Sequence, residues 1–232
     1  MKWDVNKKEN GKLIPTTLDV RMIDTVELNQ VYIFISEQRN ALPRKEFFAK
    51  ETEEEMLRPF IEGGVILGMF DEKKLVGTRY FTFPKPDTHP LAKLLKLTME
   101  EQKGLAYLKS TVIHPDYRGN KLQYRSYQWL MEYAYTMGYD RYITTIHPEN
   151  NYSLKNMFDA GFEIRELQRL YNSEEFPNGV WRFILYMDIA KEKDKYVENQ
   201  WLSPEDIEGA LRLLNEGFVG NGYENGKIRW CK

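Results

Sequence analysis

Strand-like and helix-like stretches alternate along most of this 232-residue chain, and their order is the strongest constraint on its fold. The order predicts an α/β domain with a sheet of about seven strands and helices packed on it. An insertion, residues 84–104, begins with a Pro-rich loop and continues as a helix. Strands are expected at 17–22, 65–70, 75–83, 105–113, 141–146, 162–171 and 180–189, and helices at 24–38, 52–61, 120–137 and 150–159.

The composition changes after Ile189. A charged linker, 190–199, leads to a Ser-Pro-x-Asp sequence at 203–206 that is typical of a helix start. About forty residues are too few for an independent core. We therefore expect a main domain over residues 1–190 and a C-terminal helical appendage over 191–232, packed on that domain or at a subunit contact.

Charge and cysteine content exclude several classes of function. The 33 basic and 35 acidic residues are mixed along the chain and give a net charge of −2, which offers no basic field for nucleic acid. No apolar run approaches the roughly 20 residues of a membrane span, so we expect a cytoplasmic protein without membrane contact. Cys231 is the single cysteine, and each histidine precedes a proline. Neither a disulfide nor a metal site is expected.

The segment from Val112 to Gln123 carries the clearest chemical signal. It runs from a strand through His114, Pro115 and a single glycine, Gly119, into a helix. The N–H groups of such a turn point the same way as those of the first helical turn, and the helix dipole adds positive charge. This geometry favours binding of a phosphate group. An ordinary strand-to-helix connection has the same local pattern, and the turn alone does not distinguish the two.

A second informative segment runs from His147 to Phe162. His147 and Pro148 end a strand, and Asn150 stands where a helix N-cap is expected. The helix that follows stops at Gly161.

Together the two segments resemble motifs of the GNAT superfamily of N-acetyltransferases. In motif A of that family, Arg or Gln, two residues, Gly, one residue, and Gly or Ala follow a strand. Arg118 stands at the first position, whereas Lys121 and Gln123 stand where small residues are usual. The second segment resembles the fifth strand and fourth helix of the family. The resemblance extends over residues 17–189 and is carried by 112–162.

The resemblance implies an α/β (α+β) fold with a mixed, mostly antiparallel sheet, splayed between its fourth and fifth strands, 105–113 and 141–146. It implies acetyl-CoA as the co-substrate, with the pantetheine arm between these strands. Lys121 then either holds glycine-like backbone angles with its side chain outward, displaces the loop, or reaches a CoA phosphate. The residues expected to bind the cofactor are Thr111, Val112, Ile113, Arg118, Gly119, Asn120, Lys121, Leu122, Gln123, Asn150 and Ser153.

The implied reaction is direct attack of a primary amine on the thioester in a ternary complex, with a small-molecule, amino-acid or peptide amine as acceptor. Many relatives protonate the leaving thiolate with a tyrosine at the position of Met157, and Tyr152 and Ser153 are the nearby substitutes. On the fourth strand, relatives often have a carboxylate near the substrate amine. Here Tyr107 or an ordered water is the candidate base, and a packed core residue is the other interpretation of Tyr107. A non-catalytic acyl-CoA-binding regulatory module is the first alternative function. A second alternative is an interaction protein that keeps the fold but binds no cofactor because Lys121 blocks the loop. A homodimer is left open.

Overall fold

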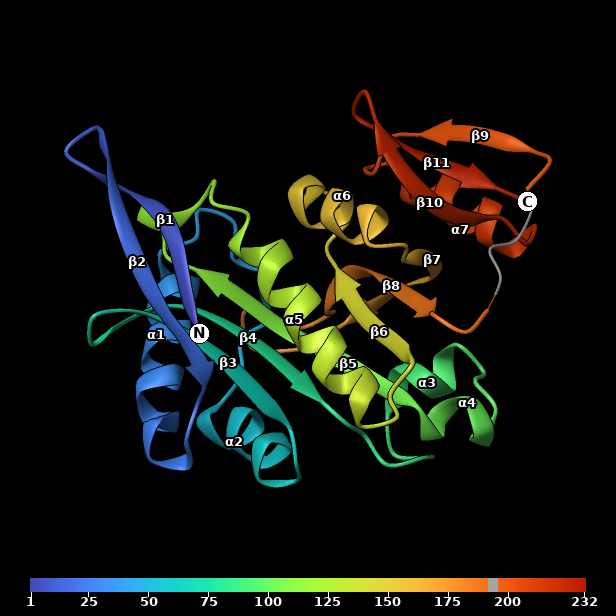
Figure 1. Ribbon diagram of the computed structural model, residues 1–232. Coiled ribbons are helices and arrows are strands. Elements are labelled where there is room, and N and C mark those ends of the chain that lie inside the picture. Colours follow the sequence, from blue (N-terminus) through green and yellow to red (C-terminus); the bar gives the residue numbers. More distant parts are fainter. Residues whose placement is uncertain (192–195) are drawn as a thin grey trace. The chain divides into compact units, whose positions relative to one another are not determined.

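The structure is a computed structural model that describes residues 1–191 and 196–232 (Figure 1). Residues 192–195, within the predicted linker 190–199, fall outside the described residues. The described chain forms two compact units. Unit 1 comprises Met1–Phe83 and Tyr107–Gly138, and unit 2 comprises Pro84–Ala106 and Tyr139–Lys232.

Unit 1 is built on five strands that follow one another in the sheet as they do in the chain, each antiparallel to the next. The first two are joined by Asn10 and Gly11, whose φ angles of 50° and 76° suit a two-residue hairpin turn. The polar start of the chain is therefore a strand, which the sequence pattern did not predict. The strands are β1 (Lys2–Glu9), β2 (Lys12–Met22), β3 (Val65–Asp71), β4 (Lys74–Thr82) and β5 (Leu105–Ile113).

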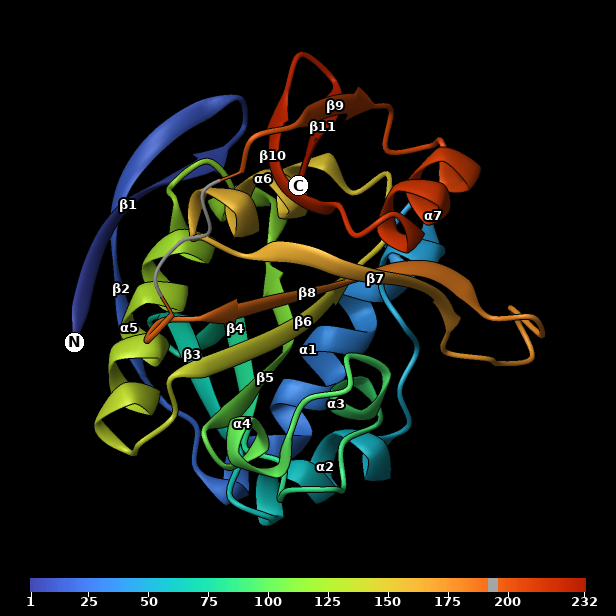
Figure 2. The same cartoon turned by 90° about the vertical axis from the view of Figure 1, so that its right-hand side faces the viewer.

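Helices cover both faces of these strands (Figure 2). Tyr80 of β4 lies in the core beneath α1 and α2, where Val31 and Met56 are also buried. The neighbouring Arg79 points to the opposite face and donates to the Gln123 carbonyl of α5. Thr52 caps α2 by accepting from the N–H of Glu55. These helices are α1 (Leu28–Asn40), α2 (Glu53–Ile61) and α5 (Leu122–Thr136), with single 3-10 turns at Thr25–Glu27, Lys45–Phe47 and Pro115–Tyr117.

Unit 2 carries six strands in the order β6-β8-β7-β10-β11-β9, and every described pairing among them is antiparallel. Its C-terminal segment extends this sheet, because Gly220 of β10 pairs with Ile164 of β7. Phe183 and Trp230 pack edge to face at 6.1 Å between ring centroids. The elements are β6 (Arg141–Ile146), α6 (Asn151–Asp159), β7 (Glu163–Leu170), β8 (Val180–Asp188), β9 (Asn199–Leu202), α7 (Ile207–Asn215), β10 (Val219–Glu224) and β11 (Lys227–Cys231).

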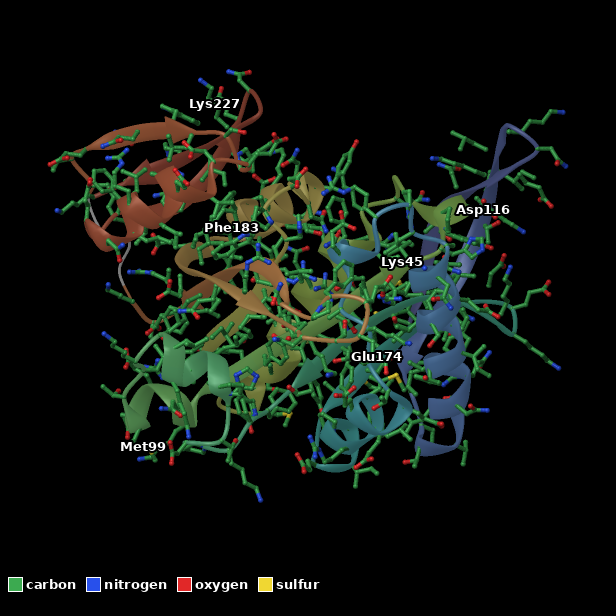
Figure 3. All side chains as sticks on the ribbon, turned by 180° about the vertical axis from the view of Figure 1, so that it is seen from behind. Lys45, Met99, Asp116, Glu174, Phe183 and Lys227 are labelled. Carbon is green, nitrogen blue, oxygen red and sulfur yellow. The ribbon has the colours of Figure 1, made fainter. Side chains whose placement is uncertain are left out.

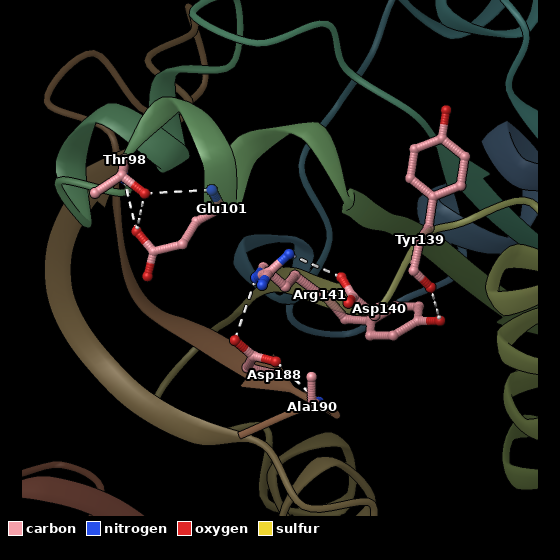
Figure 4. A network of polar contacts seen from close by, with 8 residues as sticks. Thr98, Glu101, Tyr139, Asp140, Arg141, Asp188 and Ala190 are labelled. Carbon is pink, nitrogen blue, oxygen red and sulfur yellow. Dashed lines mark hydrogen bonds and ion pairs between the residues drawn. The ribbon is translucent and has the colours of Figure 1, made fainter. Parts of the chain in front are cut away.

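The insertion forms two short helices, α3 (Pro90–Leu94) and α4 (Met99–Lys103), where one was predicted. Lys96 has a φ of 54°, which interrupts the helical backbone, and Thr98 then caps α4. Near this helix in the same unit, Arg141 bridges Asp140 and Asp188 (Figure 4).

The mixed α/β fold with a mostly antiparallel sheet is confirmed, but the described chain has eleven strands and not about seven. The four additional strands are β1 and the three of the C-terminal segment. That segment contains the expected helix, α7, yet it is not simply helical, because β9, β10 and β11 accompany it. Among the described residues, no helix is both long enough and apolar enough to cross a bilayer. The splay between 105–113 and 141–146 and the domain boundary at residue 190 remain predictions.

Candidate active site

The turn after β5 is fixed to the β3–β4 hairpin. The Nδ1 atom of His114 accepts from the N–H of Asp116 at 3.3 Å, and the His114 carbonyl accepts from the N–H of Tyr117 at 3.0 Å. Tyr117 is buried, and its hydroxyl donates to the Asp71 carboxylate. Burial and this hydrogen bond both raise the pKa of Tyr117, so the hydroxyl keeps its proton. The turn therefore has a fixed start.

Asn120 ties the same turn to strand β1. Its Oδ1 atom accepts from the N–H of Asn6 at 2.8 Å, while its Nδ2 atom donates to the Asn6 carbonyl at 2.8 Å and to the Tyr117 carbonyl at 2.9 Å. Figure 3 shows the turn, marked by Asp116, beside this N-terminal strand. The side chain of Asn120 is thus engaged within the protein, which leaves its backbone N–H as its group for a ligand.

The turn adopts left-handed backbone angles just before α5. Gly119 has a φ of 93°, and Lys121 has a φ of 55° and a ψ of 23°. Lys121 is exposed and holds glycine-like angles, in agreement with the first of the three alternatives for this residue. Contact of its ammonium group with a CoA phosphate remains a prediction. A non-glycine residue in this conformation costs about 1 kcal/mol. No side chain caps α5 at Lys121. The N–H groups of its first turn, from Leu122 on, have no acceptor within the helix.

Two arginines bring positive charge to this turn. Arg118 is exposed, and its Nε atom donates to the Ile113 carbonyl at 3.1 Å. Arg79 is 3% exposed and donates from Nη2 to the Gln123 carbonyl at 2.7 Å and from Nε to Ser126 at 3.4 Å. Burial lowers the pKa of Arg79 to about 9, so it remains charged at neutral pH. No carboxylate pairs with Arg79 within the part of the chain that is described. Its uncompensated charge lies beneath the first turn of α5.

Strand β5 holds the other predicted residues of unit 1. Thr111, Val112 and Ile113 pair with Arg79, Thr78 and Gly77 of β4. Further along, the register changes from Ser110 opposite Tyr80 to Leu108 opposite Phe81, so Lys109 is the extra residue of a β-bulge. Tyr107, predicted to be catalytic, is half-buried opposite Thr82.

The bulge residue forms an ion pair that the sequence did not reveal. The ammonium group of Lys109 donates to the carboxylate of Glu51, which lies just before α2. Burial raises the pKa of Glu51, and the nearby positive charge of Lys109 only partly opposes this shift. Glu51 and Lys109 are 58 residues apart in the sequence, so no local sequence pattern predicts this ion pair.

In unit 2, the helix start after β6 is capped by its own side chain. His147 Nδ1 accepts from the N–H of Glu149 at 3.2 Å, and the His147 carbonyl accepts from the N–H of Asn150 at 2.9 Å. The Oδ1 atom of Asn150 then accepts from the N–H of Ser153 at 3.3 Å, which makes Asn150 the N-cap of α6. Tyr152 is 88% exposed. Asn150 and Ser153 are half-buried.

Met157, at the position where many relatives have a tyrosine, is 5% exposed in unit 2. Its thioether has no proton to donate. How Tyr152 and Ser153 approach a thioester remains a prediction.

Residues 30–162 match the acetyltransferase (GNAT) family. This match covers more than half of the chain and includes both helix starts. The chain belongs to the GNAT family. The matched part of this GNAT chain ends at Phe162, so β8 and the whole C-terminal segment lie outside it.

Solved GNAT structures share this fold. An N-acetyltransferase from Staphylococcus aureus Mu50 is 14% identical, with a TM-score of 0.56, over 74% of this chain and 98% of that one. The ribosomal-protein-S18-alanine N-acetyltransferase from Escherichia coli is 13% identical, with a TM-score of 0.54, over 78% and 99%. A phosphinothricin acetyltransferase from Sinorhizobium meliloti, in complex with acetyl-CoA, is 16% identical, with a TM-score of 0.53, over 74% and 88%. No curated protein matches this GNAT chain in sequence.

Proposed function

We propose that this GNAT chain is an acetyl-CoA-dependent N-acetyltransferase that acetylates a primary amine of a small molecule, an amino acid or a peptide. The observation that carries the proposal is the uncapped, left-handed turn ahead of α5, fixed in place by Tyr117 and Asn120. A preformed turn loses little conformational freedom when it binds a ligand. The presence of acetyl-CoA in a solved relative of the same fold supports this choice of co-substrate.

The residues of the turn fit a pyrophosphate. The backbone N–H groups of residues 119–123 are the proposed donors, because a helix N-terminus favours an anion. Arg118 and the buried Arg79 add positive charge near these donors. Thr111, Val112 and Ile113 are the proposed backbone partners of the pantetheine arm, as an added strand pairs with a sheet edge. Asn150 and Ser153 are proposed further contacts. When bound, acetyl-CoA supplies the acetyl group as a thioester.

Amine attack also needs proton transfers. The attacking nitrogen must lose its ammonium proton before attack, and the departing thiolate gains a proton. Tyr152 and Ser153 are the proposed hydroxyl groups for the second transfer, whereas Tyr107 or an ordered water is the candidate expected from the sequence for the first. Holding amine and thioester in one ternary complex supplies much of the rate enhancement, so no covalent enzyme intermediate is required.

Met157 favours a second candidate function, a non-catalytic acyl-CoA-binding regulatory module. A position that carries a proton donor in many relatives holds a buried thioether here. Such a protein binds acetyl-CoA in the same turn but releases no thiol when amines are added.

Calorimetric titration with acetyl-CoA, followed in the same sample by thiol release across a panel of primary amines, distinguishes these functions. Binding with amine-dependent thiol release is the expected result. Binding without release supports the regulatory module. Absence of binding contradicts both functions.

A further inference from the structure

The ion pair between Glu51 and Lys109 is unequally exposed to solvent. The side chain of Lys109 is 11% exposed, whereas that of Glu51 is 28% exposed. The ammonium group is therefore nearly covered, while the carboxylate remains open to a molecule arriving from solvent. A carboxylate has lone pairs beyond the one that a single donor engages. Glu51 can thus hold a second cationic donor without releasing Lys109.

The position of the pair follows from the bulge in β5. Lys109 is the extra residue of that bulge, and its Nζ atom lies 5.9 Å from the centre of the Tyr80 ring on β4. The Tyr80 hydroxyl is already engaged, since it donates to the Met56 carbonyl of α2 at 2.9 Å. Two elements thus hold Lys109 in place, and Lys109 in turn holds the carboxylate of Glu51 against β5.

The surroundings of Glu51 favour proton uptake. Burial raises the pKa of its carboxyl group, and the charge of Glu55 on α2 raises it further. Lys109 on β5 acts in the opposite direction, and Tyr80 on β4 keeps its own proton because burial raises the pKa of its hydroxyl. A carboxylate whose pKa is raised by its surroundings holds a proton more strongly than an ordinary surface glutamate.

Strand β5 itself offers no carboxylate, because its nine residues from Leu105 to Ile113 include neither Asp nor Glu. The structure places one beside this strand from a distant part of the chain. Resting on the acetyltransferase function proposed above, we propose that Glu51 binds the acceptor as a primary ammonium ion and removes its proton, with Lys109 as the positioning residue.

The proton balance of this step is complete. Glu51 takes one proton from the ammonium group and later releases it to water. The free amine nitrogen forms the new C–N bond with the acetyl carbon, and the C–S bond of acetyl-CoA breaks. The second nitrogen proton leaves with the departing thiolate, which becomes the free thiol. The acceptor class is therefore a primary amine that is cationic in solution.

Replacing Glu51 with glutamine tests the proposal in the full chain. E51Q keeps the shape of the side chain but cannot accept the proton, so kcat/KM for the amine is expected to fall about 100-fold. The Kd for acetyl-CoA, measured by calorimetry, is expected to stay within about threefold. The acidic limb of the pH profile of kcat/KM, along which wild-type activity rises with pH, is expected to disappear. Glu54→Gln, an exposed neighbour on α2, is the matched control and should behave as wild type.

Lys109→Met separates positioning from simple packing. Without the ammonium group the buried carboxylate is harder to ionise, so the acidic limb is expected to move to higher pH. Lys109→Arg is expected to restore the limb toward its wild-type position. An unchanged limb in the Lys109→Met variant would contradict the role of Lys109.

A kcat/KM for E51Q within threefold of wild type overturns the assignment of Glu51 while leaving the acetyltransferase function intact. Failure of the wild-type protein to bind acetyl-CoA contradicts the function itself, so the two failures are distinguishable. If E51Q does not fold, Glu51→Asp keeps the charge and withdraws the carboxylate by one methylene. A loss of at least about tenfold is then expected, and a loss below threefold overturns the proposal.

Discussion

The two loops of this GNAT chain that lead into α5 and α6 have the same first residues but differ where the helix begins. After β5 and after β6, a histidine followed by proline accepts hydrogen bonds from two backbone N–H groups. Its ring nitrogen accepts one and its carbonyl oxygen accepts the other. Beyond His147 the chain enters α6 at once, and Asn150 satisfies the first turn with its own side chain. Beyond His114 the chain instead passes through left-handed angles at Gly119 and Lys121 and starts α5 without a side-chain cap.

This difference shows how one local motif supports two uses. A helix start that is capped from within has little need of a ligand, so its contribution is mainly to stability. A helix start whose donors are left open is prepared for an anion, and the buried charge of Arg79 strengthens that preparation. The comparison predicts that changes at the first start affect cofactor affinity, whereas changes at the second mainly affect unfolding.

The largest effect on acetyl-CoA affinity is expected from blocking the uncapped N-terminus of α5. The double variant Arg118→Ala and Gly119→Pro removes a charge and a backbone donor, and proline cannot adopt the φ of 93° found at Gly119. Acetyl-CoA affinity should fall more than about 100-fold, measured by calorimetry on protein shown to be folded. Lys121→Gly is the control, because glycine keeps the backbone angles, and its affinity should stay within about threefold. Unchanged affinity in the double variant would rule out the pyrophosphate assignment.

Removing the charge beneath the open start should have the next largest effect. Arg79→Met is expected to weaken acetyl-CoA binding about tenfold, because a buried cation interacts strongly with a nearby anion. The free energy of unfolding without ligand should change little or increase, since a buried unpaired charge is costly. Calorimetry and urea denaturation measure the two quantities. A large loss of stability with unchanged affinity would assign Arg79 a purely structural role.

At the capped start, the expected effect is mainly on stability. Asn150→Ala removes the acceptor of the Ser153 N–H and should lower the free energy of unfolding by about 1 kcal/mol. Asn150→Ser keeps a side-chain acceptor and serves as the control in the same urea titrations. If the alanine variant and the wild type had the same free energy of unfolding, the stabilising role of the Asn150 cap, and with it the contrast between α6 and α5, would be contradicted.

The smallest effect concerns the protonation of His114. Burial lowers the pKa of His114, so the folded state favours the neutral ring, whose Nδ1 atom accepts from Asp116. This contribution to stability is present above the ordinary value of about 6.5 and is lost as the pH falls through it. His114→Asn keeps an acceptor without titrating there, so its unfolding free energy should depend less on pH between about 7.5 and 5.5. The difference should be below about 1 kcal/mol for this partly exposed group. Identical pH slopes would contradict the assignment.

The sequence predicted the parts of the fold that depend on local pattern. The expected strands 105–113 and 141–146 agree with β5 and β6 at both ends, because alternation and a following turn or Pro define them. β1 was missed because only Trp3 and Val5 are buried on a charged edge strand. Its hairpin was nevertheless signalled by Asn10-Gly11, as the β10–β11 hairpin was by Asn225-Gly226.

The candidate site was only partly predictable for the same reason. The turn after β5 is local, so the anion-binding geometry proposed for it can be anticipated from the residues between His114 and Gln123. The ion pair of Glu51 with Lys109 and the placement of Arg79 under α5 depend on the packing of distant segments. The two-way bond between Asn120 and Asn6, which are 114 residues apart, is likewise a product of the tertiary fold.

If the turn binds acetyl-CoA as proposed, we expect that bond to couple the outermost strand of unit 1 to cofactor affinity. If the turn binds well only while β1 is docked, the apparent affinity equals the intrinsic affinity multiplied by the docked fraction of molecules. If β1 is undocked in about half of the molecules, the apparent affinity falls only about twofold. If it is undocked in about nine-tenths of them, the apparent affinity falls about tenfold. By the same linkage, bound acetyl-CoA should slow hydrogen exchange along β1.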